Sequence, residues 1–334
     1  MIKVWFNHWF STAYRLIELI KKDATEEIYV IGTNKQYNSV IRLVCDEWYE
    51  EPDITGEEYI DYCVEFCRKH EINVFVPRKN MVDISRNRER FTQIGTKVLV
   101  DDYDKIQLLN DKVETYNLFK DCEGIYVPEY YLVNTANELK EAYEKLKKSH
   151  DRICIKFVRD EGGMSFRRII DARDRYDMLR FYPSASVVYH ELLEILEEHG
   201  RFDDMMVMPF LPGDEISVDC LNTESGLIAI PRIKSDSRHE LVEYNDEIMR
   251  MSEIVMSRIN LECPCNIQFK IKDNIPYLLE INTRMSGGLQ MTCLAADVNV
   301  PNIALNKILG KNVPWKQDKT AKTVSYIEIP QIIK

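Results

Sequence analysis

Four side chains toward the end of the sequence have types and spacings suited to phosphoryl chemistry with a hard cation. Gln268, Glu280 and Asn282 offer only oxygen ligands, with no histidine or cysteine among them. Such ligands suit Mg²⁺, which takes most of its remaining coordination from phosphates and water. Arg284, two residues beyond the last of them, could clamp a transferring phosphoryl group. The polar outer face of an ordinary hairpin is the other interpretation of this pattern.

Two alternating strands must position these residues. The pattern predicts strands over residues 266–272 and 276–282, joined by a turn-prone Asp-Asn pair. A register that opposes Gln268 to Glu280 brings the ligands together on one face, because directly opposed residues of an antiparallel pair share a face. A two-residue loop would instead oppose Gln268 to Leu279 and scatter them. We therefore predict an odd-numbered loop or a β-bulge in this hairpin.

The stretch from Gln268 to Gly288 resembles the nucleotide-binding core of the ATP-grasp superfamily. It is most similar to the carbamoyl phosphate synthetase large-chain branch, in which the first metal ligand is a glutamine, and residues 295–301 followed by Leu309 and Gly310 resemble that branch too. The resemblance implies that ATP and Mg²⁺ bind here, with Mn²⁺ able to substitute. It assigns the metal to Gln268, Glu280 and Asn282, and catalysis to Arg284.

Composition limits the class of protein. The chain has 334 residues, enough for two or three domains, and a formal charge of −11, which argues against a nucleic-acid partner bound through a basic surface. No apolar run approaches the roughly 20 residues of a membrane span, and the first residues do not read as a signal peptide. The nine cysteines predict reduced, mostly buried thiols and a cytoplasmic protein.

The first hundred residues alternate between strand and helix patterns. We expect strands over 2–6, 27–32, 47–49, 73–77 and 97–100, with helices over 11–22, 57–70 and 85–94, which predicts an open parallel sheet. The first strand-to-helix turn lacks glycine, so it does not predict a dinucleotide site. The layout resembles the domain that precedes the nucleotide-binding region in ATP-grasp proteins, which implies substrate contacts at His8, Arg78 and Lys79.

Two lysines farther along match the phosphate-binding positions of the superfamily. Lys112 lies in a helix predicted over 106–120, and Lys156 lies inside an apolar strand over 153–158. A lysine buried in an apolar strand is costly unless an anion meets it. Gly162 and Gly163 in the following loop allow backbone amides to wrap a phosphate, as the lid of the superfamily does.

A strand predicted over 206–210 and its continuation match the adenine and ribose positions. The resemblance implies base contacts from the main chain of Met208, Phe210 and Leu211, and contact between Glu215 and the ribose hydroxyls. Pro209 has no amide to donate. The next strand, over 228–234, carries Arg232 and Lys234 on one face, and the resemblance places both near the phosphates as catalytic residues, whereas Arg238 is left open.

The resemblance covers nearly the whole chain and implies an α/β fold with an α+β C-terminal part. We expect a parallel-sheet domain over residues 1–104, a central lobe with a phosphate lid over 105–205, and a C-terminal lobe with the metal site over 206–334. The implied activity is that of an ATP-dependent ligase that joins a small carboxylic acid to an amine or other nucleophile through an acyl phosphate. The superfamily often forms dimers. A kinase-like phosphotransferase and a non-catalytic ATP-binding sensor remain alternatives, and no motif names the acid or the amine.

Overall fold

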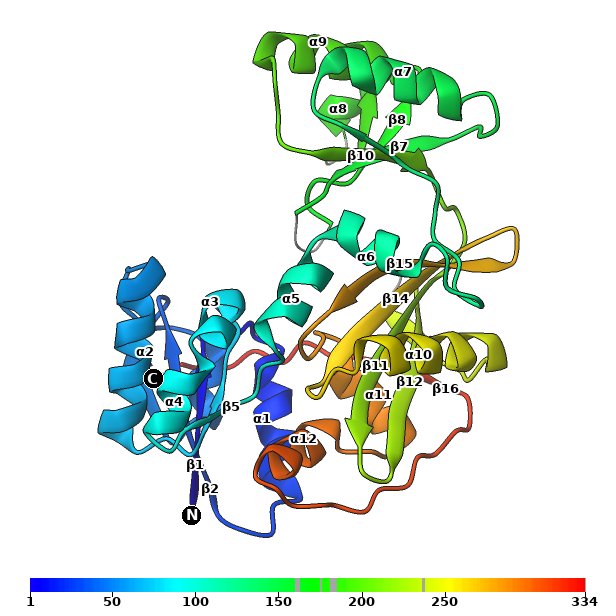
Figure 1. The fold of residues 1–334 in the computed structure, drawn as a ribbon. Coiled ribbons are helices and arrows are strands. Elements are labelled where there is room, and N and C mark those ends of the chain that lie inside the picture. The colour runs from blue at the N-terminus through cyan, green and yellow to red at the C-terminus, as the bar shows by residue number, and fades with distance from the viewer. Residues whose placement is uncertain (160–162, 175, 181–184, 236–237, 334) are drawn as a thin grey trace. The chain divides into compact units, whose positions relative to one another are not determined.

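The computed structural model describes residues 1–159, 163–174, 176–180, 185–235 and 238–333 (Figure 1). Two compact units make up the chain. The first unit comprises Met1–Leu109, Asp214–Phe269 and Glu280–Lys334, and the second comprises Asn110–Gly213 and Lys270–Leu279. The chain therefore enters the second unit twice, the second time only with the tip of one hairpin.

The first unit begins with a five-stranded parallel sheet, which confirms the predicted fold class. Its strand order is β3-β2-β1-β4-β5, and the bounds are β1 (Ile2–Asn7), β2 (Ile28–Asn34), β3 (Glu47–Glu50), β4 (Val74–Val76) and β5 (Lys97–Val98). Alternate residues of β1 enter two different cores: Val4 and Phe6 pack in one with α1 (Ala13–Lys22), and Trp5 packs in the other with α2 (Gly56–His70).

The helix predicted over 85–94 is divided in two. The structure has α3 (Met81–Arg86) and α4 (Arg88–Gln93), separated by Asn87 with φ −98° and ψ 13°. The side-chain amide of Asn87 donates to the carbonyl of Asp83 at 3.0 Å, so this short polar side chain bonds locally to the backbone instead of continuing a regular helix. A 3₁₀ helix, η1 (Val40–Val44), precedes β3, and α5 (Tyr103–Asn110) follows β5.

A six-stranded sheet follows, in the order β15-β14-β11-β12-β13-β16. Its strands are β11 (Glu215–Thr223), β12 (Gly226–Lys234), β13 (His239–Val242), β14 (Cys265–Lys272), β15 (Ile275–Asn282) and β16 (Lys322–Ser325). The helices of this part are α10 (Asp246–Ile259), α11 (Leu289–Ala296) and α12 (Val300–Ile308). The final strand is shorter than the predicted 323–329.

One hydrophobic core joins the two sheets of the first unit. It combines Val4 and Phe6 of β1 and Leu16 of α1 with Ile230 of β12 and Ala304 of α12. Asn302 of α12 also donates to the carbonyl of Ile20 in α1 at 3.1 Å. This shared core is the reason that the N-terminal sheet and the C-terminal sheet form one unit, although more than a hundred residues separate them in the chain.

The second unit is a five-stranded sheet, β6-β10-β7-β8-β9, covered on both faces. Its strands are β6 (Tyr131–Val133), β7 (Ile153–Phe157), β8 (Arg167–Ile170), β9 (Ser186–Val188) and β10 (Met205–Pro209). One core packs α7 (Ala136–Leu146) and α9 (Tyr189–His199) on one face, and the other packs α6 (Lys112–Phe119) on the opposite face. The short α8 (Asp177–Arg180) lies between β8 and β9 in the sequence. None of the described helices is long and apolar enough to cross a membrane.

Candidate active site

The predicted metal hairpin is β14 and β15, and its loop has two residues. Asp273 and Asn274 have φ values of 52° and 62°, the left-handed pair that a tight hairpin turn requires and that Asn and Asp tolerate. The alternative of an odd-numbered loop is therefore wrong. With a two-residue turn, Lys272 opposes Ile275, and counting back along both strands would oppose Gln268 to Leu279.

The burial of β15 changes phase partway along the strand. Pro276 and Leu278 are buried, the next two residues are half-buried, and Ile281 is buried again. On the facing strand the alternation is regular from Ile267 to Phe269. A β-bulge at Leu279–Glu280 would produce this shift, because one extra residue moves every later side chain to the other face. Such a bulge would oppose Gln268 to Glu280, and this second alternative stays a prediction.

The three predicted ligands are half-buried and are held by hydrogen bonds along their own strands. The carboxamide of Asn282 donates to Glu280 Oε1 at 3.0 Å, and the Arg284 guanidinium donates to Asn282 Oδ1 at 3.1 Å. The Gln268 Nε2 atom donates to Asn266 Oδ1 at 3.3 Å, so the Gln268 oxygen is the atom turned away from that partner. Among the described residues, no three His, Cys, Asp or Glu side chains are grouped to hold a metal ion. The set fits Mg²⁺ through carboxamide and carboxylate oxygens, which are hard ligands.

A buried polar cluster lies beside the metal hairpin. The Asn266 amide nitrogen lies 2.8 Å from Asp219 Oδ1 and 2.9 Å from Ser217 Oγ, and the Thr292 hydroxyl donates to Asp219 Oδ2 at 2.9 Å. All four residues are at most 2% exposed. The cluster joins β11, β14 and α11, and buried polar groups that satisfy one another fix a single arrangement.

Arg232, predicted near the phosphates, is buried in this structure. Its guanidinium forms an ion pair with Glu240 of β13, and its Nη2 lies 3.4 Å from Ser217 Oγ. A Cβ on Gly288 would lie 2.1 Å from Nη2, so only glycine fits where this guanidinium meets the start of α11. The role of Arg232 in catalysis stays a prediction, and its observed contacts are structural.

Glu215 and Lys234 bind each other across the β11–β12 pair. They are directly opposed in the register, and their charged groups form an ion pair. The side chains are 26% and 34% exposed. The residue predicted to hold the ribose and the residue predicted near the phosphates are therefore neighbours on one face, as the alternation of their strands predicts.

Lys112 and Lys156 lie together in the second unit. Both residues are 8% exposed. Lys112 Nζ donates to the carbonyl of Val158 at 3.2 Å, and Lys156 Nζ donates to the Tyr116 hydroxyl at 3.1 Å and lies 5.2 Å from the centre of that ring. The Tyr116 hydroxyl in turn donates to the carbonyl of Leu279 at 3.0 Å. One tyrosine thus connects Lys156 to the main chain of β15.

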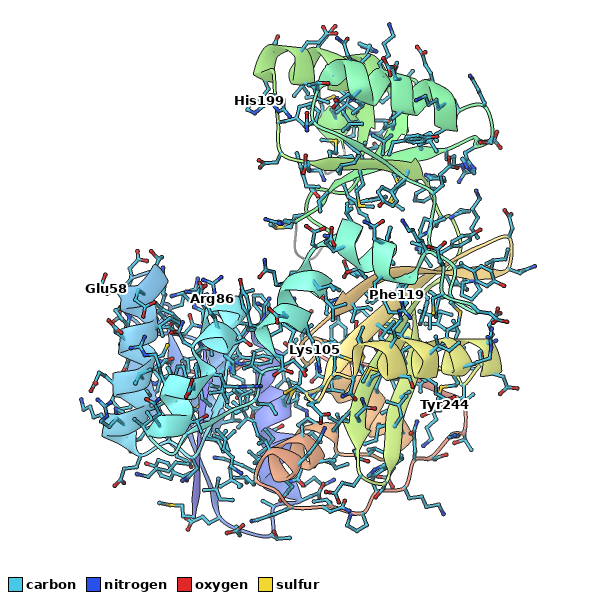
Figure 2. The ribbon with its side chains drawn as sticks, viewed as in Figure 1. Glu58, Arg86, Lys105, Phe119, His199 and Tyr244 are labelled. Atoms are coloured by element: carbon cyan, nitrogen blue, oxygen red, sulfur yellow. The ribbon has the colours of Figure 1, made fainter. Side chains whose placement is uncertain are left out.

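The helix predicted over 106–120 is two helices, and Asp111 is the reason. Its carboxylate accepts hydrogen bonds from the amides of Val113 and Glu114, the capping pattern that starts a new helix, α6. Lys112 is therefore the first residue of α6. Phe119 near the end of this helix, labelled in Figure 2, is fully buried and anchors it.

The predicted adenine strand is β10. Met208 and Leu211 are buried, and Met208 shares an apolar cluster with Tyr116, Cys154, Val158 and Met206. The amide of Phe210 donates to the carbonyl of Arg152 at 2.9 Å, so this amide is already used in the sheet. Of the predicted lid, Gly162 lies outside the described residues, and Gly163 has φ +69°, where glycine is favoured.

The carboxyl ends of β1, β3 and β4 carry a charged cluster in the N-terminal sheet. Glu51 is 3% exposed and accepts from the Tyr59 hydroxyl. Lys79 Nζ lies 3.2 Å from Glu51 Oε1 and 4.0 Å from the centre of the Tyr59 ring. Arg78 donates its amide to Asn7 Oδ1 at 2.7 Å, and its guanidinium lies over the Phe10 ring at 4.7 Å.

His8 lies at this same edge with an uncommon backbone. Its φ is +49°, and its Nδ1 is buried with no hydrogen-bond partner in the described part of the chain. Burial lowers the pKa of the imidazole, so the neutral form is favoured. Non-glycine residues held in the left-handed region gather at binding sites, where the surroundings offset the cost. The sheet reverses its strand order between β1 and β4, and ligands bind at such a point.

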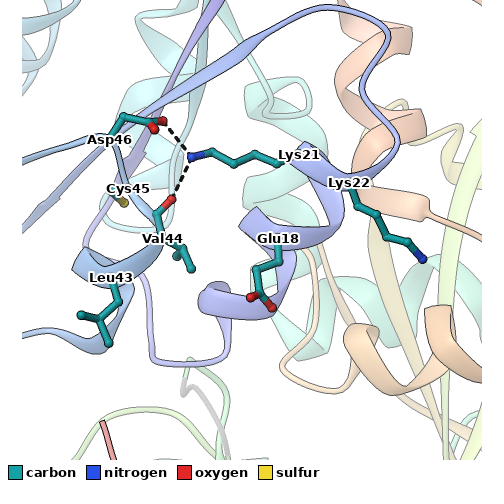
Figure 3. A pocket seen from close by; sticks show the side chains of 7 residues that line it. All are labelled: Glu18, Lys21, Lys22, Leu43, Val44, Cys45 and Asp46. Atoms are coloured by element: carbon teal, nitrogen blue, oxygen red, sulfur yellow. Dashed lines mark hydrogen bonds and ion pairs between the residues drawn. The ribbon is translucent and has the colours of Figure 1, made fainter. Parts of the chain in front are cut away.

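A separate hollow lies elsewhere in the N-terminal sheet domain. Figure 3 shows it between α1 and the segment before β3, lined by Lys21, Cys45 and Asp46 among others. Lys21 Nζ bridges the carbonyl of Val44 at 3.0 Å and Asp46 Oδ2 at 2.8 Å. None of the predicted site residues lines it.

Two family descriptions match the chain. Residues 201–331 match "ATP-grasp in the biosynthetic pathway with Ter operon", and residues 11–99 match "PylC-like, N-terminal domain". Residues 201–331 therefore match an ATP-grasp domain. The predicted resemblance is confirmed, and the ATP-grasp domain follows a PylC-like N-terminal domain.

The chain is similar to curated proteins named carbamoyl phosphate synthase large chain. The chain is 23% identical over 314 residues to the carbamoyl phosphate synthase large chain of Pseudothermotoga lettingae, and 21% identical over 308 residues to that of a Thermoanaerobacter species. These matches cover 90% and 87% of this chain but only 27% and 26% of the relatives. The chain thus spans about a quarter of the length of these curated relatives.

Solved structures share the fold at low sequence identity. N5-carboxyaminoimidazole synthetase from Staphylococcus aureus, complexed with ADP, matches with a TM-score of 0.72 and 13% identity, over 98% of this chain and 82% of that one. The biotin carboxylase domain of Hydrogenobacter thermophilus 2-oxoglutarate carboxylase, with MgADP, ADP and bicarbonate, matches with a TM-score of 0.68 and 16% identity, over 94% and 71%. Both show that this chain shares their fold.

Several residues of the site escaped sequence reasoning. They are the buried acids Asp219 and Glu51, the half-buried Glu240, and the hydroxyls of Tyr116 and Thr292. One signal was present: β11 reads Glu-Ile-Ser-Val-Asp, with polar residues at every second position of a strand that is otherwise apolar. That alternation predicts a polar face continuing past Glu215 to Asp219. Tyr116 and Thr292 bind partners far along the chain, and Glu51 and Glu240 bind residues eight positions away on another element, so none of them leaves a local pattern.

Proposed function

We propose that this protein is an ATP- and Mg²⁺-dependent ligase that joins a small carboxylic acid to an amine or another nucleophile. The observation that carries the proposal is the burial shift in β15, which supports a bulge that turns Glu280 to the face of Gln268. A hairpin serving only the fold needs no such shift. The family and the ligase neighbours support the reaction class, and the identity of the acid and of the nucleophile is not part of the proposal.

The proposed reaction has two balanced steps. A carboxylate oxygen of the acid attacks the γ-phosphorus of ATP, the bond to the β-phosphate oxygen breaks, and ADP leaves. The nucleophile then attacks the carbonyl carbon of the acyl phosphate, the carbon–oxygen bond to phosphate breaks, and the nucleophile loses a proton. Net products are the joined molecule, ADP and phosphate, and no side chain becomes covalently modified.

The chain's residues position and neutralise charge in these steps. Gln268, Glu280 and Asn282 would hold Mg²⁺, which when bound offsets charge on the phosphates. Arg284, tied to Asn282 at 3.1 Å, lies next to this set and would meet the transferred phosphoryl group. In the second unit, Lys156 beside Tyr116 would bind phosphate as a fixed cation.

Two further predicted residues take narrower roles in the proposal. Lys112 would hold phosphate from the start of α6. Glu215 would bind the ribose hydroxyls, for which Lys234 must release it. The apolar cluster around Met208 and the carbonyls of β10 would receive the base.

The strand-end cluster of the N-terminal sheet would contact the acid or the nucleophile. His8 presents a buried nitrogen that needs a partner, and Lys79 holds a positive charge against the buried Glu51. A neutral imidazole beside cations suits a ligand that carries a carboxylate.

The test measures phosphate and ADP while ATP and Mg²⁺ are offered with pools of amino acids and small carboxylic acids. The proposal predicts phosphate release only with particular acid and nucleophile pools, and its loss in Glu280→Ala. ADP formed without phosphate would indicate a kinase-like phosphotransferase instead. If no pool gives ADP or phosphate although Mg·ATP binds tightly, a non-catalytic ATP-binding sensor would be favoured.

A further inference from the structure

Asp219 lies on β11, and it touches none of the predicted ligands directly. Its Oδ1 lies 2.8 Å from the Asn266 amide nitrogen, and its Oδ2 accepts from the Thr292 hydroxyl at 2.9 Å. It is 2% exposed. A buried carboxylate can only accept hydrogen bonds, so whatever faces it must donate.

Because Asp219 can only accept hydrogen bonds, it determines the orientation of the Asn266 carboxamide. The Ser217 hydroxyl lies 2.9 Å from the Asn266 nitrogen and 3.0 Å from its oxygen, and a hydroxyl can serve either atom. Asp219 cannot, since a reversed carboxamide would set oxygen against oxygen. The nitrogen of Asn266 therefore faces Asp219, and its oxygen faces the other way.

The orientation passes to the next residue of the same strand face. Asn266 Oδ1 accepts from Gln268 Nε2 at 3.3 Å. A carboxamide whose nitrogen is drawn to this oxygen presents its own oxygen on the opposite side. If Asn266 were reversed, its NH₂ group would attract the Gln268 oxygen instead and would turn the Gln268 nitrogen outward, where it cannot bind a cation.

We propose that Asp219 is a positioning residue for the metal site. By fixing the Asn266 carboxamide, it turns the oxygen of Gln268 outward as a ligand for a divalent cation. The inference rests on the proposed function, which supplies the cation. It adds two residues behind the ligands, Asp219 and Asn266, and it states which atom of the Gln268 carboxamide faces the cation. A chain with Glu in place of Gln268 would not need this device, because both atoms of a carboxylate end are oxygen.

The experiment measures Mn²⁺ binding to the full chain in the presence of ADP, by electron paramagnetic resonance of free Mn²⁺. Asp219→Asn is expected to weaken Mn²⁺ binding about tenfold, because residues behind a metal ligand typically contribute on that scale. The same change in the Gln268→Glu background is expected to weaken it less than about twofold, since orientation no longer matters there. Should Asp219→Asn not fold, Asp219→Ser makes the same comparison, because a hydroxyl donates as well as accepts.

Controls separate orientation from general damage. Ser252→Ala removes another buried hydroxyl, which donates to the Ile248 carbonyl at 2.7 Å on α10, and should leave Mn²⁺ binding unchanged. An equal loss from Asp219→Asn in both backgrounds would overturn the positioning role and leave Asp219 a structural residue. Unchanged binding in both would overturn it too. If the unaltered chain with ADP binds no Mn²⁺, the proposed function itself fails, and the positioning role fails with it.

Discussion

The two units hold their candidate site residues in different ways. In the first unit, charged side chains bind one another: Arg232 pairs with Glu240, and Lys234 pairs with Glu215. In the second unit, Lys156 lies against the ring and hydroxyl of Tyr116, within an aromatic and apolar cluster. The Arg232–Glu240 pair is part of the folded core, so breaking it should lower stability, whereas the Glu215–Lys234 pair is partly exposed. The arrangement in the second unit is built around cations, so breaking it should lower nucleotide affinity.

The largest effect is expected where a buried ion pair loses one member. Glu240→Gln leaves the Arg232 guanidinium, whose residue is 3% exposed, without its charge partner. We expect a loss of about 3 kcal/mol in the free energy of unfolding, measured by urea denaturation. Arg232→Met added to Glu240→Gln should recover part of that loss. Glu243→Gln, at an exposed position, is the control. If Glu240→Gln were as stable as Glu243→Gln, the Arg232–Glu240 pair would not stabilise the fold, and the proposed difference between the two units would be wrong.

Substitution of Lys156 in the second unit should instead lower the affinity for ATP. Lys156→Met keeps an apolar stem in β7 and removes the ammonium group, and we expect ATP binding to weaken by about 2 kcal/mol or more, measured by calorimetry. Lys148→Met, at an exposed position after α7, should bind ATP as the unaltered chain does. Unchanged affinity in Lys156→Met would contradict the assignment of this lysine to phosphate.

A smaller effect is expected from the hydroxyl of Tyr116. Tyr116→Phe keeps the ring but removes the bonds to Lys156 and to the Leu279 carbonyl. Loss of these bonds should weaken Mg·ATP binding by about 1 kcal/mol, which is roughly fivefold. Tyr130→Phe alters a neighbouring ring, 5.7 Å from that of Tyr116, and provides the matched comparison. Equal behaviour of the two variants would show that the bridge to the hairpin has no role in binding.

The smallest change concerns the partly exposed pair of the first unit. Glu215→Gln should alter the free energy of unfolding by less than about 1 kcal/mol, because exposed ion pairs contribute little. Its effect should be seen in nucleotide affinity, which is expected to fall for ATP and for ADP alike, since both carry the ribose. A loss in the free energy of unfolding as large as that of Glu240→Gln would contradict this expectation, because the Glu215–Lys234 pair would then stabilise the core as the Arg232–Glu240 pair does.

Much of the fold could be predicted because it follows local patterns. The alternation of β1, β2 and β4 with amphipathic helices gave the parallel sheet, and the Asp-Asn turn gave the hairpin. The breaks at Asn87 and Asp111 were missed, since both residues also occur within helices and their capping bonds depend on the fold. The extent of the first unit was not predictable from pattern, because its shared core joins α1 to α12 across the chain.

In the candidate site, too, features that follow a local pattern could be predicted and contacts formed only in the folded chain could not. Gln268, Glu280 and Asn282 were predicted as ligands from residue type and spacing, and an odd-numbered loop or a bulge was predicted from counting residues. The pairing of Arg232 with Glu240 was not found, because Glu240 lies on a short strand that the sequence did not predict. The orienting contact of Asp219 joins residues 47 apart, and only the folded sheet brings them together.

The most direct test of the proposed ligase follows the oxygen atoms. Once the pools identify an acid, that acid is supplied with ¹⁸O in its carboxylate, together with ATP, Mg²⁺ and the nucleophile, and the released phosphate is analysed by mass spectrometry. Formation of an acyl phosphate predicts one ¹⁸O in each phosphate released, because the carboxylate oxygen that attacks phosphorus leaves with it. Phosphate without the label, formed at the same rate as the product, would contradict the account.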